Sequence, residues 1–291
     1  MSTSWSKRLL PIWLVLAASC ASQAPKRAAA PPPAAPAVAA PIASPTSATP
    51  AAAAPVYFSP SQLDSTALIE PPPMVGSEAA RADLQAVLDA QRAGHAAGTT
   101  ARAVADAVID CQRVAEVLEP AVSPQGPVAN AAPLRSGEGA DAVAFATRAA
   151  KQVSGATGPP KTHWGRARPY VENPAVERLG DVAPDSPLAV KGGFERDHTS
   201  YPSGHTAFGT GCAIVLALMV PEQRAALFAR ARLYGESRLI VGAHFPTDLD
   251  AGRRVGTAAA GVMLQSALFQ ADLLTARAQL RRALGLPQIA P

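Results

Sequence analysis

Three separated blocks of the sequence carry most of the polar residues that could do chemistry. They are "KTHWGRARP" with Lys161 and Arg168, "PSGH" from Pro202 to His205, and "SRLIVGAHFPTD" with Arg238, His244 and Asp248. Only 16% of the chain is charged, so this set of cations, a hydroxyl and two imidazoles calls for one common explanation. Fixed cations and hydrogen-bond donors of this kind suit a bound polyanion such as phosphate.

The "PSGH" block has the pattern of a helix start. The first turn of a helix leaves backbone N–H groups unpaired and carries about half a positive charge. Gly204 lets an anion approach the backbone closely, and Ser203 can either cap the helix or donate its hydroxyl. The block therefore predicts an anion-binding site at this helix start, with His205 fixed in the first turn beside it.

The third block places an imidazole and a carboxylate around a second helix start. Pro246 suits the first position of a helix, which puts His244 just before the helix and Asp248 in its first turn. A carboxylate there can accept the imidazole N–H, fix the tautomer and make the other nitrogen more nucleophilic. Alternatively, Asp248 only complements the helix dipole. The spacing alone leaves both interpretations open.

The three cations in these blocks would form a charge clamp. A transferring phosphoryl group spreads its charge over equatorial oxygens, and rigid donors around those oxygens lower the barrier. The guanidinium groups of Arg168 and Arg238 can each bind two oxygens, whereas Lys161 supplies a movable point charge.

Together the blocks read Lys-x6-Arg-Pro, Pro-Ser-Gly-His and Ser-Arg-x5-His-x3-Asp. This pattern resembles the signature of the type 2 phosphatidic acid phosphatase superfamily, which includes the vanadium haloperoxidases. Within it, "SYPSGHT" and "PPP…ADLQAVLDAQ" are most similar to bacterial class A non-specific acid phosphatases, over residues 57–285. Thr199 departs from that class, whose motif usually begins with Gly.

The resemblance implies a role for each motif residue. His244 would be the nucleophile that forms a phosphohistidine, Asp248 would orient it, and His205 would protonate the leaving oxygen and then activate water. The phosphate would be held by Lys161, Arg168, Ser203, Gly204 and Arg238. The resemblance implies neither a metal nor another cofactor, and the sequence has no H-E-x-x-H motif or tight Asp/His cluster.

Residues that flank the blocks have less certain roles. Four of them either line the substrate mouth or are structural: His163, Trp164, Arg166 and Tyr201. Three more precede this anion-binding site and either shift its pKa values, contact the substrate or are solvated loop charges: Glu195, Asp197 and His198. We expect no role for His95.

The elements that must position these residues are predicted to be helices, because the chain is rich in Ala, Leu and Val and only 5% aromatic. One helix starts at a Ser77 cap, with Leu84, Val87 and Leu88 on one face. A continuous helix is predicted over 99–119 and is stopped by Pro120. Its apolar positions recur every three to four residues: Val104, Val108, Cys111, Ala115 and Leu118.

The second half of the chain repeats this pattern around the motif blocks. A helix is expected over 136–153, followed by an irregular and functional stretch over 154–202. The run from 203 to 220 is apolar nearly all round and predicts a buried central helix. Pro221 marks another helix start, and one or two closing helices follow from Pro246. The fold class is thus all-α, with a single helix-bundle-like domain over 57–291.

The N-terminus has the features of an export signal. Lys7 and Arg8 precede an apolar run that is too short for a membrane span, so residues 1–19 are predicted to be a signal peptide. The run ends in "LAASC", which resembles a lipobox with Cys20 as the lipidated residue; ordinary cleavage near Ala21 or Ser22 is the alternative. Residues 20–56, rich in Ala and Pro, are predicted to be a disordered tether.

These features predict an exported protein, either periplasmic or an outer-membrane lipoprotein anchored at Cys20. In an oxidising compartment Cys111 and Cys212 either pair as a disulfide or stay as buried thiols. The net charge of +4 is too small and scattered for a nucleic-acid partner. The expected partners are small phosphomonoesters and the membrane, and homo-oligomerisation stays open.

The leading hypothesis is a metal-independent acid phosphatase for phosphate monoesters that works best in mild acid. The alternatives are a lipid phosphatase, a vanadate-dependent haloperoxidase, and a non-catalytic phosphate-binding lipoprotein. The last would need no His244 or His205, yet both are present. Activity towards lipid phosphates only, or halide oxidation that depends on vanadate, would favour one of the other two.

Overall fold

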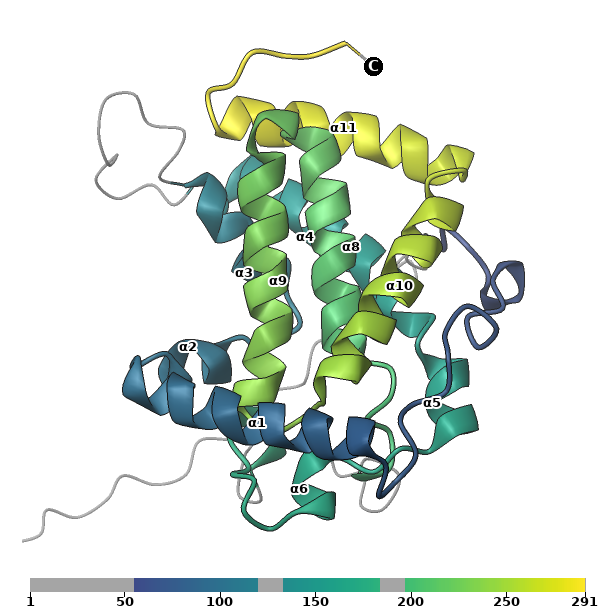
Figure 1. The fold of residues 1–291 in the computed structure, drawn as a ribbon. Helices are drawn as coiled ribbons and strands as arrows, with labels where there is room; N and C mark the ends of the chain where they lie inside the picture. The colour runs from purple at the N-terminus through teal and green to yellow at the C-terminus, as the bar shows by residue number, and fades with distance from the viewer. Residues whose placement is uncertain (1–54, 120–132, 184–196, 291) are drawn as a thin grey trace, which may run out of the picture. The chain divides into compact units, whose positions relative to one another are not determined.

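The computed structural model describes residues 55–119, 133–183 and 197–290, all of which lie in one compact unit, Ala53–Pro291 (Figure 1). The predicted signal peptide, Cys20, most of the tether and Glu195 lie outside the described residues. The described residues contain no strand, which confirms the all-α prediction. None of their helices combines the length and apolarity needed to cross a bilayer.

The helical elements are numbered as in Figure 1. In chain order they are η1 (Pro60–Gln62), α1 (Glu78–Ala96), α2 (Thr100–Ala105), α3 (Gln112–Ala115), η2 (Glu116–Leu118), α4 (Gly137–Gly155), α5 (Gly158–Trp164), α6 (Pro169–Glu172), η3 (Gly180–Val182), α8 (Gly204–Met219), η4 (Pro221–Gln223), α9 (Arg224–Ile240), α10 (Pro246–Met263) and α11 (Ala267–Ala283).

Helix α8 is the buried centre of this arrangement, as its apolar sequence predicts. It packs against α4, α9 and α10, and also contacts α11. Small residues let these helices approach closely. A Cβ added to Gly252 of α10 would lie 2.4 Å from the carbonyl oxygen of Ser203, and one added to Gly256 would lie 2.9 Å from the backbone of Ala207. The start of the helix that follows the "PSGH" block is therefore held tightly against α10.

This close packing predicts that Gly252→Ala destabilises the fold. The new Cβ would overlap the Ser203 carbonyl, and overpacking of this kind costs about 1–3 kcal/mol of unfolding free energy. Gly261→Ala on the same helix is the matched control, because a Cβ there meets no described atom within 4 Å. That change should be neutral or stabilising by roughly 0.5–1 kcal/mol. Urea unfolding of the two variants checks this, and equal midpoints would contradict it.

The prediction of one continuous helix over 99–119 is wrong. Helix α2 ends at Ala105, and α3 begins only at Gln112. The break has a physical reason: the Asp106 carboxylate is fully buried and pairs with Arg230, so the chain turns inward where a regular helix would continue. Val104 and Val108, expected on the buried face, are 36% and 43% exposed.

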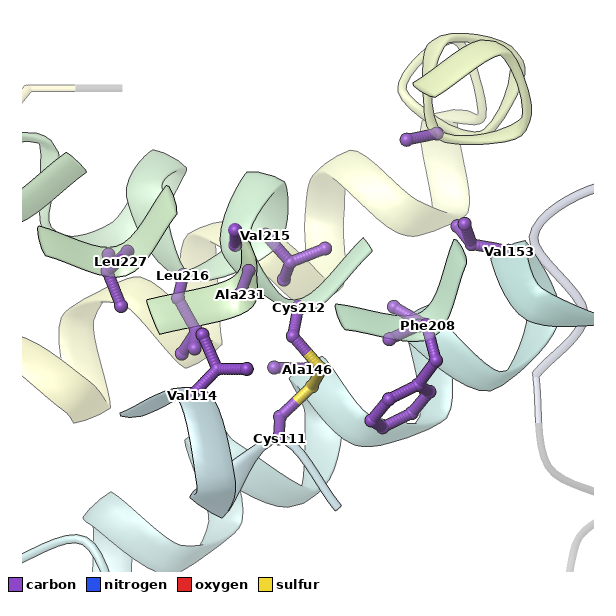
Figure 2. Close-up of a cluster of buried hydrophobic side chains, with 14 of the residues drawn as sticks. Cys111, Val114, Ala146, Val153, Phe208, Cys212, Val215, Leu216, Leu227 and Ala231 are labelled. Atoms are coloured by element: carbon purple, nitrogen blue, oxygen red, sulfur yellow. A yellow bond between two sulfur atoms is a disulfide. The ribbon is translucent and has the colours of Figure 1, made fainter. Parts of the chain in front are cut away.

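The two cysteines of the described chain form a disulfide, Cys111–Cys212. It joins the residue before α3 to the middle of α8 and lies in the core beside Val114, Ala146 and Leu216 (Figure 2). Of the two alternatives that the sequence leaves open, the structure therefore shows the pair. A cross-link over 101 residues restricts the unfolded chain, an effect worth about 4–5 kcal/mol in the chain-entropy description.

The helix starts predicted at Ser77 and Pro221 agree with the structure to within about one turn. The Ser77 hydroxyl caps α1 by accepting from the Ala80 N–H. Val87 is buried in a second, smaller apolar cluster, with Leu84 and Leu88 packed against it. Pro221 opens the 3-10 turn η4 rather than α9 itself, which begins at Arg224.

Candidate active site

The site is built where two helices begin and a third ends. Helix α8 starts at Gly204, α10 starts at Pro246, and α9 ends at Ile240, just before the turn that carries His244. The Ser203 N–H donates to the Asp248 carbonyl at 2.9 Å, which ties the two helix starts together. Two positive helix ends therefore lie in one place.

The turn between α9 and α10 fixes His244 relative to Arg238. Gly242 has φ +77°, and a Cβ there would lie 2.2 Å from the Glu177 carbonyl oxygen, so only glycine fits. The N–H groups of Ala243 and His244 both donate to the Arg238 carbonyl, at 2.9 and 3.3 Å.

The His244 ring is buried beside the Asp248 carboxylate. Its Nδ1 lies 3.4 Å from Asp248 Oδ2. The same oxygen accepts from the Ser200 hydroxyl at 2.6 Å and from the Phe245 N–H at 2.8 Å. Asp248 thus caps α10 and also stands against the imidazole, so the two interpretations of this residue do not exclude each other.

A second carboxylate supports Asp248 through a shared arginine. Arg166 Nη1 donates to Asp248 Oδ1 at 2.7 Å, and its Nη2 donates to Asp83 Oδ2 at 2.9 Å. Thr247 Oγ1 accepts from Arg166 and donates to Asp83. The three charged side chains are at most 7% exposed. This buried network holds Asp248 through Oδ1, whereas the imidazole stands against Oδ2.

Sequence reasoning missed Asp83 and Ser200, and it considered Arg166 only as a residue at the substrate mouth. One signal was available for Asp83: it is an acidic residue one turn before Val87, on the same face of the helix. Such a buried charge needs a partner. No local signal marks Ser200.

The other ring nitrogen of His244 faces the cations. Arg168 Nη1 lies 3.4 Å from His244 Nε2 and donates to the Ala243 carbonyl at 2.8 Å. Arg238 is 1% exposed and pairs with Asp181 at 2.7 Å through Nη2. Its Nε and Nη1 have no hydrogen-bond partner among the described residues. Buried guanidinium donors without a protein partner favour an anionic ligand.

Lys161 lies on α5 and reaches the segment that precedes α8. Its Nζ donates to the Thr199 carbonyl at 2.6 Å. Because this contact uses the backbone, it does not depend on the side chain at position 199, where the class usually has Gly. Burial, and then the charge of Arg168, lowers the pKa of Lys161 to about 7, against an opposing effect of Asp248.

Ser203 and Gly204 open α8 as the sequence predicts. Ser203 Oγ accepts from Thr206 N–H at 3.2 Å and from Thr206 Oγ1 at 3.0 Å, so the residue is a helix cap whose own O–H can still donate. A Cβ at Gly204 would meet Thr157 Oγ1 at an ordinary 3.4 Å. Packing alone therefore does not require glycine at this position. A ligand that approaches the backbone closely would explain why glycine is found there.

His205 is held by a backbone carbonyl. Its Nε2 lies 3.1 Å from the Ala107 oxygen. A carbonyl oxygen only accepts, so Nε2 carries the proton, and Nδ1 is the nitrogen that can exchange a proton with a ligand. Burial, and then the charge of Arg238, lowers the pKa of His205 to about 3, while Asp181 and the Ala107 carbonyl raise it. In the unliganded protein the ring is neutral in mild acid.

Electrostatic effects on His244 show that the three blocks converge. Burial, and then the charges of Arg168, Lys161 and Arg238, holds the pKa of His244 well below its usual range, and a protonated His205 would lower it further. The imidazole is therefore neutral, as a nucleophile must be. The structure thus brings together every residue that the sequence predicts for the phosphate site: Lys161, Arg168, Ser203, Gly204, His205, Arg238, His244 and Asp248.

The flanking residues have mostly structural contacts. The Tyr201 hydroxyl donates to the Glu70 carbonyl, Asp197 accepts from the Tyr170 hydroxyl, and the rings of His163 and Trp164 meet edge to face. The exposed His95 pairs with Glu177.

Residues 142–271 match the PAP2 superfamily and form a PAP2 superfamily domain. Every residue predicted for the phosphate site lies within this range, whereas Cys20 lies outside it.

Three relatives in particular are similar to part of this chain. The chain is 36% identical over 125 residues to a non-specific acid phosphatase of Salmonella typhimurium, covering 43% of this chain and 46% of that protein. It is 31% identical over 125 residues to an acid phosphatase of Zymomonas mobilis, covering 42% and 43%. It is 37% identical over 71 residues to a lipid A 1-phosphatase of Rhizobium etli, covering 24% and 29%. The chain spans less than half the length of these curated relatives.

Proposed function

We propose that the protein is a metal-independent acid phosphatase that hydrolyses phosphate monoesters through a phosphohistidine at His244. One observation carries this proposal: the two nitrogens of His244 face opposite partners, Asp248 at Nδ1 and the Arg168 guanidinium at Nε2. An oriented imidazole aimed at a cluster of cations is suited to attack phosphorus. The relatives named acid phosphatase support the same activity.

The reaction would run in two displacement steps. In the first, His244 Nε2 forms a bond to phosphorus while the bond from phosphorus to the ester oxygen breaks, and His205 gives a proton to the departing oxygen. In the second, His205 takes a proton from water, and the resulting hydroxyl displaces the imidazole and releases phosphate. Arg168, Arg238 and Lys161 would stabilise the charge on the phosphoryl oxygens in both steps.

The low pKa of His205 bears on where the first proton comes from. The free ring is neutral, but a bound phosphate brings negative charge that offsets the effect of Arg238. A phosphate monoester carries its own proton below its second pKa, which is about 6. The monoanionic substrate would therefore deliver the proton to His205 Nδ1, which then passes it to the leaving oxygen. This route explains an acid optimum without a protonated histidine in the free enzyme.

A panel of phosphate esters tests the proposal. We expect turnover of several soluble monoesters, unchanged by EDTA and inhibited by vanadate. A phosphorylated enzyme trapped by rapid quench should be acid-labile and alkali-stable, as a phosphohistidine is. Loss of activity in EDTA would contradict metal independence, and vanadate-dependent halide oxidation would favour the haloperoxidase.

The site also predicts the alkaline limb of the pH profile. With a pKa of about 7, Lys161 is charged below that pH and loses its charge above it, so the clamp weakens as the pH rises. Lys161→Arg keeps the charge to far higher pH. We expect kcat/KM at pH 8 relative to pH 6 to be about 3–10-fold higher in this variant than in the wild type. Lys161→Met should lower kcat/KM most at the acid end. An unchanged limb in Lys161→Arg would contradict the assignment.

A lipid phosphate is the second candidate substrate, because a lipid A 1-phosphatase is among the similar proteins. Phosphatidic acid and lipid A in detergent micelles belong in the same panel. A kcat/KM higher for these than for p-nitrophenyl phosphate would favour the lipid phosphatase.

We further propose that the protein is exported and anchored to a membrane through Cys20. The sequence "LAASC" and the Ala/Pro-rich tether support an anchor, and the disulfide is typical of an oxidising compartment. Metabolic labelling with a fatty acid should mark the wild type and not Cys20→Ala. Label in both proteins, or in neither, would overturn the anchor.

A further inference from the structure

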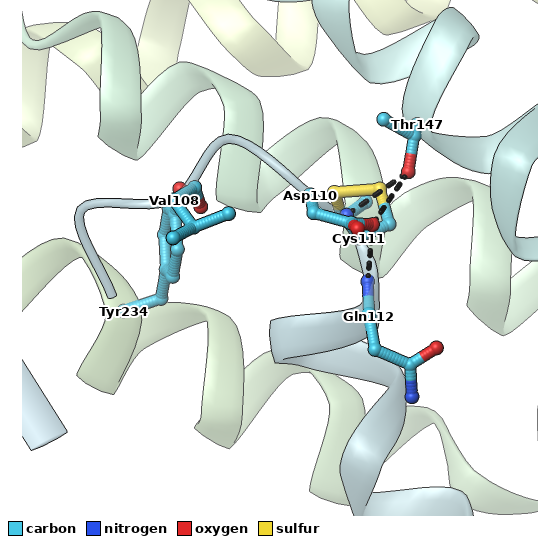
Figure 3. The surroundings of a disulfide bond; sticks show 7 residues. Val108, Asp110, Cys111, Gln112, Thr147 and Tyr234 are labelled. Atoms are coloured by element: carbon cyan, nitrogen blue, oxygen red, sulfur yellow. Dashed lines mark hydrogen bonds between the residues drawn. A yellow bond between two sulfur atoms is a disulfide. The ribbon is translucent and has the colours of Figure 1, made fainter. Parts of the chain in front are cut away.

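The loop that interrupts the helix predicted over 99–119 runs from Asp106 to Cys111, and we call it the 106–111 loop (Figure 3). Its second residue, Ala107, provides the carbonyl that accepts the His205 Nε2 proton. The position of the loop therefore sets the orientation of the His205 ring, and none of the three motif blocks contains it.

Asp106 fastens the start of this loop to α9. Its carboxylate is fully buried and accepts from Arg230 Nη2 at 2.5 Å, from Arg230 Nη1 at 3.2 Å and from the Ser237 hydroxyl at 2.7 Å. Ser237 directly precedes Arg238 in the third block. The Asp106 side chain thus links the start of the loop, next to Ala107, to Ser237, the neighbour of Arg238.

The rest of the loop is fastened to three helices. The Val108 carbonyl accepts from the Tyr234 hydroxyl of α9 at 2.9 Å. At the far end, Thr147 of α4 contacts both Asp110 and the Cys111 N–H at 3.0–3.1 Å, and Cys111 is bonded to Cys212 of α8 (Figure 3). A six-residue segment without regular structure is therefore held at both ends and in the middle.

We propose that the 106–111 loop is a positioning element for the leaving-group acid, with Asp106 as its positioning residue and the disulfide as its far anchor. The inference rests on the proposed function for the role of His205. The loop keeps the proton on Nε2 and so presents Nδ1 to the ester oxygen. Without Asp106, the Ala107 carbonyl can move, and the ring loses both its fixed tautomer and its aim.

The test compares substrates that differ in their need for an acid. p-Nitrophenolate leaves without protonation at neutral pH, whereas an alkoxide does not. We expect Asp106→Asn to lower kcat/KM for glycerol phosphate about 10–100-fold, because general acid catalysis contributes about 10²–10⁴-fold. For p-nitrophenyl phosphate the loss should be under about 3-fold. A general structural defect would lower both values equally, and that result would overturn the proposal.

Two further variants serve as a second test and as a control. The double change Cys111→Ala and Cys212→Ala releases the far anchor and should show the same selective loss, which keeps the test decisive if Asp106→Asn does not fold. Glu116→Gln is the matched control: Glu116 pairs with the same Arg230 at 2.6 Å but contacts neither Ser237 nor the loop carbonyl. It should leave the ratio of the two kcat/KM values unchanged; an equal shift in the control would contradict the role of Asp106.

Nitrogen-15 NMR of the histidine rings separates this inference from the proposed function, because it needs no turnover. The wild type should show His205 as the Nε2–H tautomer, and the Asp106 and cysteine variants should show a mixed population. If the wild type lacked phosphatase activity but the variants still changed the His205 tautomer, the proposed function would fail, whereas the control of the His205 ring by the loop would stand. A wild-type His205 protonated at Nδ1, or tautomers unchanged in both variants, would overturn the inference.

Discussion

His244→Ala is expected to lower kcat by roughly 10⁴–10⁶-fold, the range seen when a catalytic nucleophile or its base is removed. The cations around the ring can still bind phosphate, but they cannot attack phosphorus. Inorganic phosphate should therefore bind the variant with an affinity close to that of the wild type. Single-turnover assays and isothermal titration calorimetry measure the two quantities separately.

The matched control for this change is His95→Ala, which removes an exposed imidazole paired with Glu177. Its kcat should be unchanged. If His244→Ala kept more than about a hundredth of the wild-type rate, far above the expected loss, or still formed an alkali-stable phosphoenzyme, the nucleophile would be a different residue.

Asp248→Asn is expected to lower kcat by about 10⁴-fold, as the equivalent change does in a serine-protease triad. The structure adds a second effect. Both carboxylate oxygens accept hydrogen bonds, Oδ1 from Arg166 and Oδ2 from Ser200 and Phe245. An amide NH2 in either place would face a donor, so one partner loses its acceptor. Breaking a buried charge pair of this kind costs about 3–5 kcal/mol of unfolding free energy.

Urea unfolding and steady-state kinetics check the two effects of Asp248→Asn on the same preparation. Asp250→Asn is the control and should change neither, because this residue lies on the same helix and its ion-pair partner among the described residues is the exposed Arg253. A stable Asp248→Asn protein with near wild-type kcat would show that Asp248 serves α10 as a cap and nothing more.

Much of the site could be predicted because its signals are local. The "SGH" run and Pro246 mark helix starts in the chain itself, and a helix start defines where the next few side chains point. The apolar run of α8 likewise predicts a buried helix without any knowledge of its neighbours. The convergence of the three blocks followed from their shared chemistry and the family resemblance, not from periodicity.

The features that escaped prediction depend on partners far away in the chain. Asp106 breaks a helix that its neighbours favour because Arg230, 124 residues later, compensates its burial. Asp83 reaches Arg166 over 83 residues in the same way. An apolar pattern covers only a short stretch of sequence, so it does not include the distant cation. The pattern therefore assigns each such carboxylate to the surface. The sequence leaves the Cys111–Cys212 pairing open because the two residues are 101 positions apart.

The packing of α8 also bears on how the protein would lose activity on heating. Ser203, Gly204 and His205 are attached to the helix that α4, α9 and α10 enclose, so they cannot come loose without opening the core. Segments of this kind unfold only with the whole domain, whereas sites on peripheral loops fail earlier. The backbone positions of Ser203, Gly204 and His205 should therefore persist on heating until the domain melts cooperatively.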